Sequence, residues 1–69
     1  MDIGKALKYY RENAGLMQGE LAEKLGIKEE TYCKYEESDG MSIRIDLLSK
    51  IAGALGIDIV DVFKKAEEY

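Results

Sequence analysis

Residues 18–27, Q-G-E-L-A-E-K-L-G-I, decide the fold of this 69-residue chain. Leu21 and Leu25 lie one helical turn apart, so both face the same side of a helix. Ala22 is small enough to let a second helix cross closely at that side. Gly26 supplies the backbone freedom that a short turn requires. The stretch therefore predicts the first helix of a helix-turn-helix, over residues 18–25, and the turn that follows it.

Residues 28–37 are predicted to form the second helix of this unit. Tyr32 and Tyr35 lie three residues apart and share the side that packs on the core. The outward face then carries Glu29, Glu30, Cys33 and Lys34. In a helix-turn-helix, this outward face of the second helix is the surface that normally enters the DNA major groove.

Glycines and short polar residues mark the ends of the other helices, because the chain contains no proline. Asp2 and Asp58 can cap helices, and Asp61 can complete a capping box with Asp58. Gly15 and Gly56 can end them. The predicted helices are therefore residues 3–14, 18–25, 28–37, 44–55 and about 58–65, with the loop 38–42 between the third and the fourth.

The composition suits a single all-α domain over residues 1–69, with residues 64–69 as a candidate polar tail. Hydrophobic residues make up 46% of the chain and charged residues 35%, a balance that argues against disorder. No stretch alternates apolar and polar residues as a strand would. A chain of this length buries only roughly 60% of its unfolded surface, which leaves no room for a second core.

Several classes of function are excluded by the residues that the chain lacks. It has no histidine and one cysteine, Cys33, so we expect no metal site, no cofactor and no enzyme activity. No apolar stretch is long enough to span a bilayer, and the first residues form a polar helix rather than the apolar segment of a signal peptide. We therefore expect a cytoplasmic protein.

Taken together, these motifs resemble the Cro/cI (XRE) family of lambda-repressor-like DNA-binding domains. The resemblance covers nearly the whole chain, in residues 3–7 (IGKAL), 11 (R), 15–18 (GLMQ), 21–27 (LAEKLGI), 35–36 (YE) and 51–57 (IAGALGI). It implies a compact five-helix fold with the helix-turn-helix at helices two and three. It also implies a transcriptional regulator, expected to be a repressor, that binds operator DNA as a homodimer and needs no cofactor.

The resemblance also assigns roles to single residues. Gln18 would place its amide on a phosphate and touch the outward face of the next helix. Arg11 and Glu36 match a pair that forms an internal salt bridge in the family. The implied dimer surface lies on the last two helices, around Ile57, Ile59, Val60 and Phe63. The implied DNA contacts come from Gln18, Lys28, Glu29, Glu30, Thr31, Lys34, Ser38, Ser42 and Arg44.

The charge of the chain opposes this assignment. The net charge is −4 and the isoelectric point about 4.7, whereas DNA-binding domains usually carry a basic surface. Residues 28–40 contain two lysines against five acidic residues. The alternative is therefore a helix-turn-helix used as a protein-interaction module, whose acidic face meets a basic partner.

Two interpretations of Glu29 and Glu30 remain open. A carboxylate can accept a hydrogen bond from cytosine N4 and so contribute to base recognition. Alternatively, both residues are solvated and favoured by the positive end of the helix. Cys33 is expected to be a half-exposed thiol without a role, since a redox switch would require a lowered pKa. Tyr32 replaces the family's usual aliphatic residue, so it would either widen the helix crossing or leave its hydroxyl without a partner.

Overall fold

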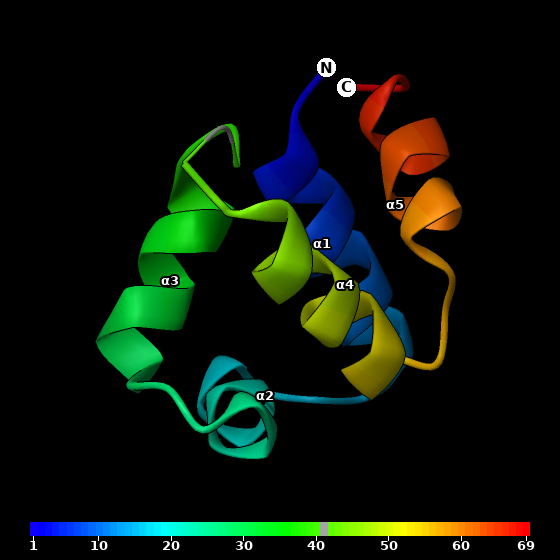
Figure 1. The fold of residues 1–69 in the computed structure, drawn as a ribbon. Helices are drawn as coiled ribbons and strands as arrows, with labels where there is room; N and C mark the ends of the chain where they lie inside the picture. Colours follow the sequence, from blue (N-terminus) through cyan, green and yellow to red (C-terminus); the bar gives the residue numbers. More distant parts are fainter. Residues whose placement is uncertain (41) are drawn as a thin grey trace.

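The computed structural model describes residues 1–40 and 42–69, which form five helices around one core (Figure 1). α1 packs against α3 and α5, α2 packs against α3 and α4, and α4 packs against α5, so the helix contacts run in a closed ring. The described residues contain no strand. The five-helix all-α fold is therefore confirmed. The helices are α1 (Ile3–Asn13), α2 (Gln18–Leu25), α3 (Glu29–Glu37), α4 (Ile45–Ala54) and α5 (Ile59–Ala66).

The predicted caps of the first and last helices are present. Asp2 Oδ1 accepts a hydrogen bond from the Lys5 backbone N–H at 2.9 Å. At α5, Asp58 Oδ1 accepts from the Val60 N–H, and Asp61 Oδ2 accepts from the Asp58 N–H in return. These bonds satisfy backbone donors that the first turn of a helix leaves free.

Three predicted helices are too long by one residue at an end, and α4 is too long at both ends. Lys28 and Arg44 have extended backbones and hold the N-cap positions of α3 and α4, so neither belongs to its helix. Leu55 and Ala14 are C-cap residues that follow α4 and α1. Ala14 is also exposed.

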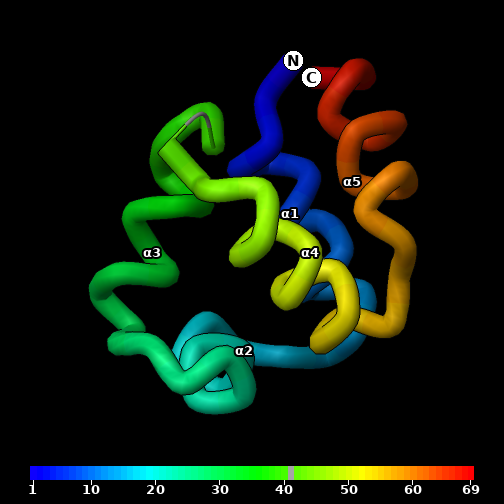
Figure 2. The backbone as a smooth tube through the Cα atoms, viewed as in Figure 1, coloured from blue at the N-terminus to red at the C-terminus, as the bar shows by residue number. Residues whose placement is uncertain are grey.

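The predicted polar tail begins later than residue 64. α5 continues through Ala66, which is fully buried one turn after Val62. The Ala66 carbonyl accepts a hydrogen bond from the Asp2 N–H at 3.1 Å, so the two ends of the chain lie side by side (Figure 2). Ala66 is therefore a core residue, although Lys65 and Glu67 on either side of it in the sequence are charged.

The core lies inside the ring of helices. Gly4 in α1 allows the closest approach, because a side-chain carbon there would collide with the Tyr35, Glu36 and Ser38 carbonyls at the end of α3. This contact fixes α3 against α1. The buried apolar residues are Ile3, Ala6, Leu7, Leu21, Ala22, Tyr32, Leu48, Ile51, Ala52, Val62 and Ala66.

Candidate nucleic-acid interface

The turn between α2 and α3 has the geometry that the sequence predicts. Gly26 has a φ of +71°, in the left-handed region that favours glycine. The Ile27 N–H donates to the Ala22 carbonyl at 3.1 Å and closes the turn. Leu21 and Ala22 are buried under α3 and α4. The orientation of α3 is therefore set by packing on α2 and on the core.

A buried ion pair holds the inner side of α3. Arg11 Nε lies 2.6 Å from Glu36 Oε2, and Arg11 Nη2 donates to Glu36 Oε1 at 3.1 Å. Arg11 Nη1 donates to the Leu16 carbonyl at 2.7 Å, so the guanidinium also fixes the segment between α1 and α2. Both side chains are more than nine-tenths buried. The pair ties α1, α2 and α3 together.

Gln18 lies in the same network. Its Nε2 donates to Glu36 Oε1 at 3.0 Å, and its Oε1 accepts from Cys33 Sγ at 3.1 Å. Burial by itself would raise the pKa of Glu36, but the Arg11 guanidinium, the nearby Tyr32 hydroxyl and the Gln18 amide together outweigh it, and the pKa lies below its usual value. The Gln18 amide therefore bridges the inner and outer faces of α3. Its proposed contact with a phosphate stays a prediction.

Tyr32 is fully buried, and its hydroxyl has no hydrogen-bond partner in the described part of the chain. Burial, with the nearby Glu36 carboxylate as a second cause, raises the pKa of Tyr32 far above its usual value. This is the second of the two alternatives expected for Tyr32, in which the hydroxyl lacks a hydrogen-bond partner. Its ring is part of the buried core, and its hydroxyl lies near the Glu36 carboxylate without forming a well-aligned hydrogen bond.

Cys33 lies half-buried on the flank of α3 that faces α2. Burial and the carboxylates of Glu29 and Glu37 raise the pKa of its thiol. A thiol with a raised pKa carries little thiolate and reacts slowly. The surroundings of Cys33 therefore disfavour a redox role.

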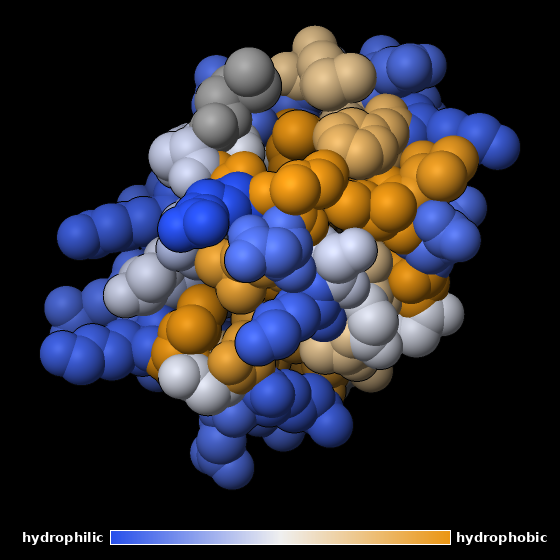
Figure 3. Space-filling model, in the orientation of Figure 1, coloured by the Kyte–Doolittle hydropathy of each residue, from blue (hydrophilic) through white to orange (hydrophobic). Residues whose placement is uncertain are grey.

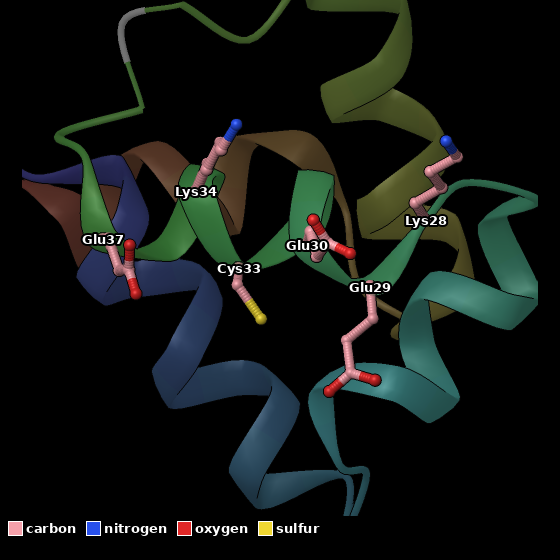
Figure 4. Close-up of a pocket in the computed structure, with 6 residues that line it drawn as sticks. All are labelled: Lys28, Glu29, Glu30, Cys33, Lys34 and Glu37. Atoms are coloured by element: carbon pink, nitrogen blue, oxygen red, sulfur yellow. The ribbon is translucent and has the colours of Figure 1, made fainter.

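The outward face of α3 forms an open hollow of about 580 Å³ (Figure 4). It holds two lysines against three glutamates, a net charge of −1. In Figure 4, Lys28 and Lys34 extend to one side of α3, whereas the Glu29 carboxylate extends to the other side, towards α2. The residues that line the hollow are Lys28, Glu29, Glu30, Cys33, Lys34 and Glu37.

The remaining predicted contact residues do not line this hollow. Thr31 is half-buried on α3. Ser38 Oγ donates to the Tyr35 carbonyl and accepts from the Gly40 N–H, so its hydroxyl is used within the loop. Ser42 is exposed, and Arg44 Nε lies 3.7 Å from Asp46 Oδ1 at the start of α4, with both side chains in solvent. Met41, in the same predicted loop, lies outside the described residues.

The N-termini of the helices differ in how they are capped. α1 and α5 have aspartate caps, whereas no side chain among the described residues caps the first N–H groups of α2, α3 or α4. At α2, Glu20 Oε1 accepts a hydrogen bond from the Met17 backbone N–H. This bond does not satisfy the N–H groups within the first turn of the helix. Uncapped helix N-termini are favourable places for anions. The first turns of these three helices also carry acidic residues, which compete for that role.

In the view of Figure 3, the side of the molecule at α3 differs in polarity from the side at α4 and α5. Charged side chains project around α3, whereas apolar side chains gather over α4 and α5 (Figure 3). Val60 is 51% exposed there, and Ile57, Ile59 and Phe63 are half-buried. The predicted dimer residues therefore lie at an apolar surface separate from the exposed face of α3.

Two helices joined by a tight turn, with the second presenting an exposed face, define a helix-turn-helix domain. The chain belongs to the helix-turn-helix family of the Cro/cI type, which matches residues 7–62. This is a family of DNA-binding transcription regulators. The lambda-repressor-like fold inferred from the sequence is confirmed.

The chain is also similar to solved structures. It resembles the clp gene regulator ClgR from Corynebacterium glutamicum with a TM-score of 0.88 and 27% identity, over 96% of this chain and 69% of that one. A second ClgR structure gives a TM-score of 0.84 and 29% identity, over 96% and 83% of the two chains. HppE in its FeII form gives 0.81 and 30% identity over 87% of this chain, but only 31% of HppE is matched. No curated protein sequence matches the chain.

The described residues form neither a membrane-spanning helix nor a cluster of potential metal ligands. None of the described helices combines the length and apolar character needed to cross a bilayer. Within residues 1–40 and 42–69, no three potential metal-ligating side chains come together.

Proposed function

We propose that this chain is a transcriptional repressor that binds operator DNA as a homodimer, with α3 in the major groove. The observation that carries the proposal is the exposed face of α3, held rigidly by the Arg11–Glu36 pair in a member of the Cro/cI family. Similarity to the regulator ClgR supports it. No cofactor takes part, and such a regulator acts in the cytoplasm.

The uncapped N-termini of α2, α3 and α4 supply the backbone part of this interface. In protein–DNA complexes, phosphate contacts commonly come from main-chain N–H groups at helix starts, and they fix the position of the protein on the duplex. Gln18, Ser42 and Arg44 lie at or before two of these starts and supply side-chain donors. Lys28 and Lys34 supply the positive charge beside the groove.

The proposed dimer places two copies of α3 on one side of the duplex. The apolar surface over α4 and α5 leaves α3 exposed, so pairing there does not cover the DNA-binding face. Half-sites would then lie about one helical turn of DNA apart, or a multiple of it.

The acidic face supports a second candidate function. A net charge of −1 on the hollow of α3 and of −4 on the chain favours a basic protein partner over DNA. In that case the domain is an interaction module that does not bind DNA. The two functions predict opposite results with the same reagent, a short duplex.

Lysine substitutions test which surface meets DNA. Lys28→Gln and Lys34→Gln should each weaken duplex binding uniformly across sequences and reduce the salt slope of log K by about one. Lys8→Gln is the matched control, because Lys8 lies on α1 at a separate hollow with Lys5, Tyr9, Glu12 and Tyr69. Fluorescence anisotropy measures all three. Equal affinity of the Lys28, Lys34 and Lys8 variants would contradict binding through α3.

A further inference from the structure

The two adjacent glutamates of α3 lie in different surroundings. A side-chain carbon built on Gly19 of α2 would lie 2.9 Å from Glu29 Oε1 and 3.2 Å from the carboxylate carbon of Glu29. The Glu29 side chain therefore folds across Gly19, against the first turn of α2 (Figure 4). The absence of a side chain at Gly19 creates the space that this carboxylate occupies.

Glu30 lies at the centre of the exposed face. It is two residues from the buried Tyr32, which places it about 200° around the helix from the core. Its carboxylate makes no ion pair or hydrogen bond with any residue in the described part of the chain. In Figure 4 it lies on the exposed side of α3, whereas Glu29 extends towards α2. It also belongs to the first turn of α3, the part of a recognition helix that contacts base edges.

The chemistry of a carboxylate restricts what it can recognise. An ionised carboxylate only accepts hydrogen bonds. In the major groove, guanine and thymine present acceptors, and adenine presents the N7 acceptor beside its N6 donor, whereas cytosine presents only the N4 donor. Cytosine is therefore the base whose edge fits an acceptor without repulsion. The charge of Lys34, one turn further along α3, offsets part of the repulsion between this carboxylate and the phosphates.

We infer that Glu30 determines base specificity by accepting a hydrogen bond from cytosine N4, and that Glu29 contacts no base. The inference rests on the proposed binding of DNA and adds the base that the operator must contain. It gives different roles to two neighbouring carboxylates that the sequence does not distinguish. Glu29 packs on α2, and Glu30 faces the groove.

Selection of bound sequences from a random duplex pool tests this inference. The wild-type chain should recover a sequence with a C·G pair at one fixed position of each half-site. Glu30→Gln should move the preference at that position to adenine, because a glutamine amide both donates and accepts and fits adenine N6 and N7. The change in preference should be about fivefold or more, as expected for one base contact.

Two controls separate recognition from charge. Glu37→Gln removes the same charge from the other end of the same hollow, and Glu29→Gln removes it from the neighbouring residue. Both variants should bind all duplexes more tightly, and both should still select cytosine at the same position of the half-site. Thermal unfolding of the three variants should stay within a few degrees of that of the wild-type chain, since all three residues are exposed.

The outcomes are distinguishable. A recovered sequence that lacks the cytosine, or one that Glu30→Gln leaves unchanged, would overturn the inference and leave the proposed function standing. An equal change of base preference in Glu37→Gln and Glu30→Gln would also overturn the inference and leave the proposed function standing. Recovery of no sequence, together with no binding of any duplex, would overturn the proposed function and this inference with it.

Discussion

Glu36 is a carboxylate whose ionised form the fold requires. It accepts two hydrogen bonds from Arg11 and one from Gln18 while almost wholly buried. Removing one member of such a pair leaves an uncompensated buried charge, which costs more than the pair contributes to folding. The intact Arg11–Glu36 pair therefore need not add much to stability, whereas the loss of either member should be costly.

The pH dependence of stability should reveal this carboxylate. Because the pKa of Glu36 is lower in the folded chain, its contribution is fully present above the unfolded value, near 4.5, and is lost as the pH falls through the folded value. At neutral pH, Glu36→Gln should be less stable than the wild-type chain by about 3 kcal/mol. Urea unfolding at a series of pH values should show this difference shrinking below pH 4.5. A difference that is the same at all pH values would contradict the assignment.

The unpaired hydroxyl of Tyr32 should be a cost to the fold. A buried hydroxyl without a partner destabilises a protein by about 1–3 kcal/mol, and Tyr32→Phe removes it while keeping the ring. The variant should therefore melt at a higher temperature, by about 4–8 °C for each kcal/mol gained in a domain of this size. Circular dichroism measures the change. A lower melting temperature would mean that the hydroxyl has a partner worth more than its burial costs.

At the scale of helices, the crossing of α1 and α3 depends on Gly4. A methyl group there would meet three backbone carbonyls of the α3 end, and backbone cannot move aside as a flexible side chain can. Gly4→Ala should lower the free energy of unfolding by about 1–3 kcal/mol, the usual cost of overpacking.

Gly53 provides the matched control for this prediction. It lies inside α4, is exposed, and a side-chain carbon there would meet nothing within 4 Å. Gly53→Ala should therefore stabilise the chain by about 0.5–1 kcal/mol through helix propensity alone. If chemical denaturation gave both variants the same sign of change, the close approach at Gly4 would not be the cause.

The sequence predicted the helices well because their ends are determined locally. Gly26 and the aspartates at residues 2 and 58 act on neighbouring backbone groups, which a pattern of spacing captures. Ala66 was missed because its burial depends on α1, more than 50 residues away in the sequence. Gly4 was recognised only as part of a family motif, because no neighbouring residue in the sequence indicates that a glycine is needed there.

The site was predicted less completely for the same reason. The outward face of α3 follows from helical periodicity, and that part of the prediction needs no tertiary information. The different placements of Glu29 and Glu30 depend on Gly19 in another helix. The link from Gln18 to Glu36 and Cys33 likewise joins two helices, and only the packing of α2 on α3 brings those atoms together.

At the scale of the whole molecule, the polar and apolar faces are separate, and each carries one part of the proposed function. Val60→Glu places a charge on the exposed apolar surface of α5 and should shift the chain towards the monomer in analytical ultracentrifugation. Met17→Glu, at an apolar residue that is 72% exposed outside that surface, should leave the association unchanged. A dimer that persists in the Val60 variant would place the interface elsewhere.

The central claim is that an acidic chain binds DNA through α3, and the salt dependence of duplex binding tests it most directly. Anisotropy of a labelled duplex should show binding at low ionic strength, with log K falling linearly against log salt by about 0.9 for each phosphate contacted. The operator recovered by selection should bind more tightly, and its log K should also fall linearly against log salt. Absence of binding to both duplexes at low ionic strength would contradict the account and favour the protein-interaction module.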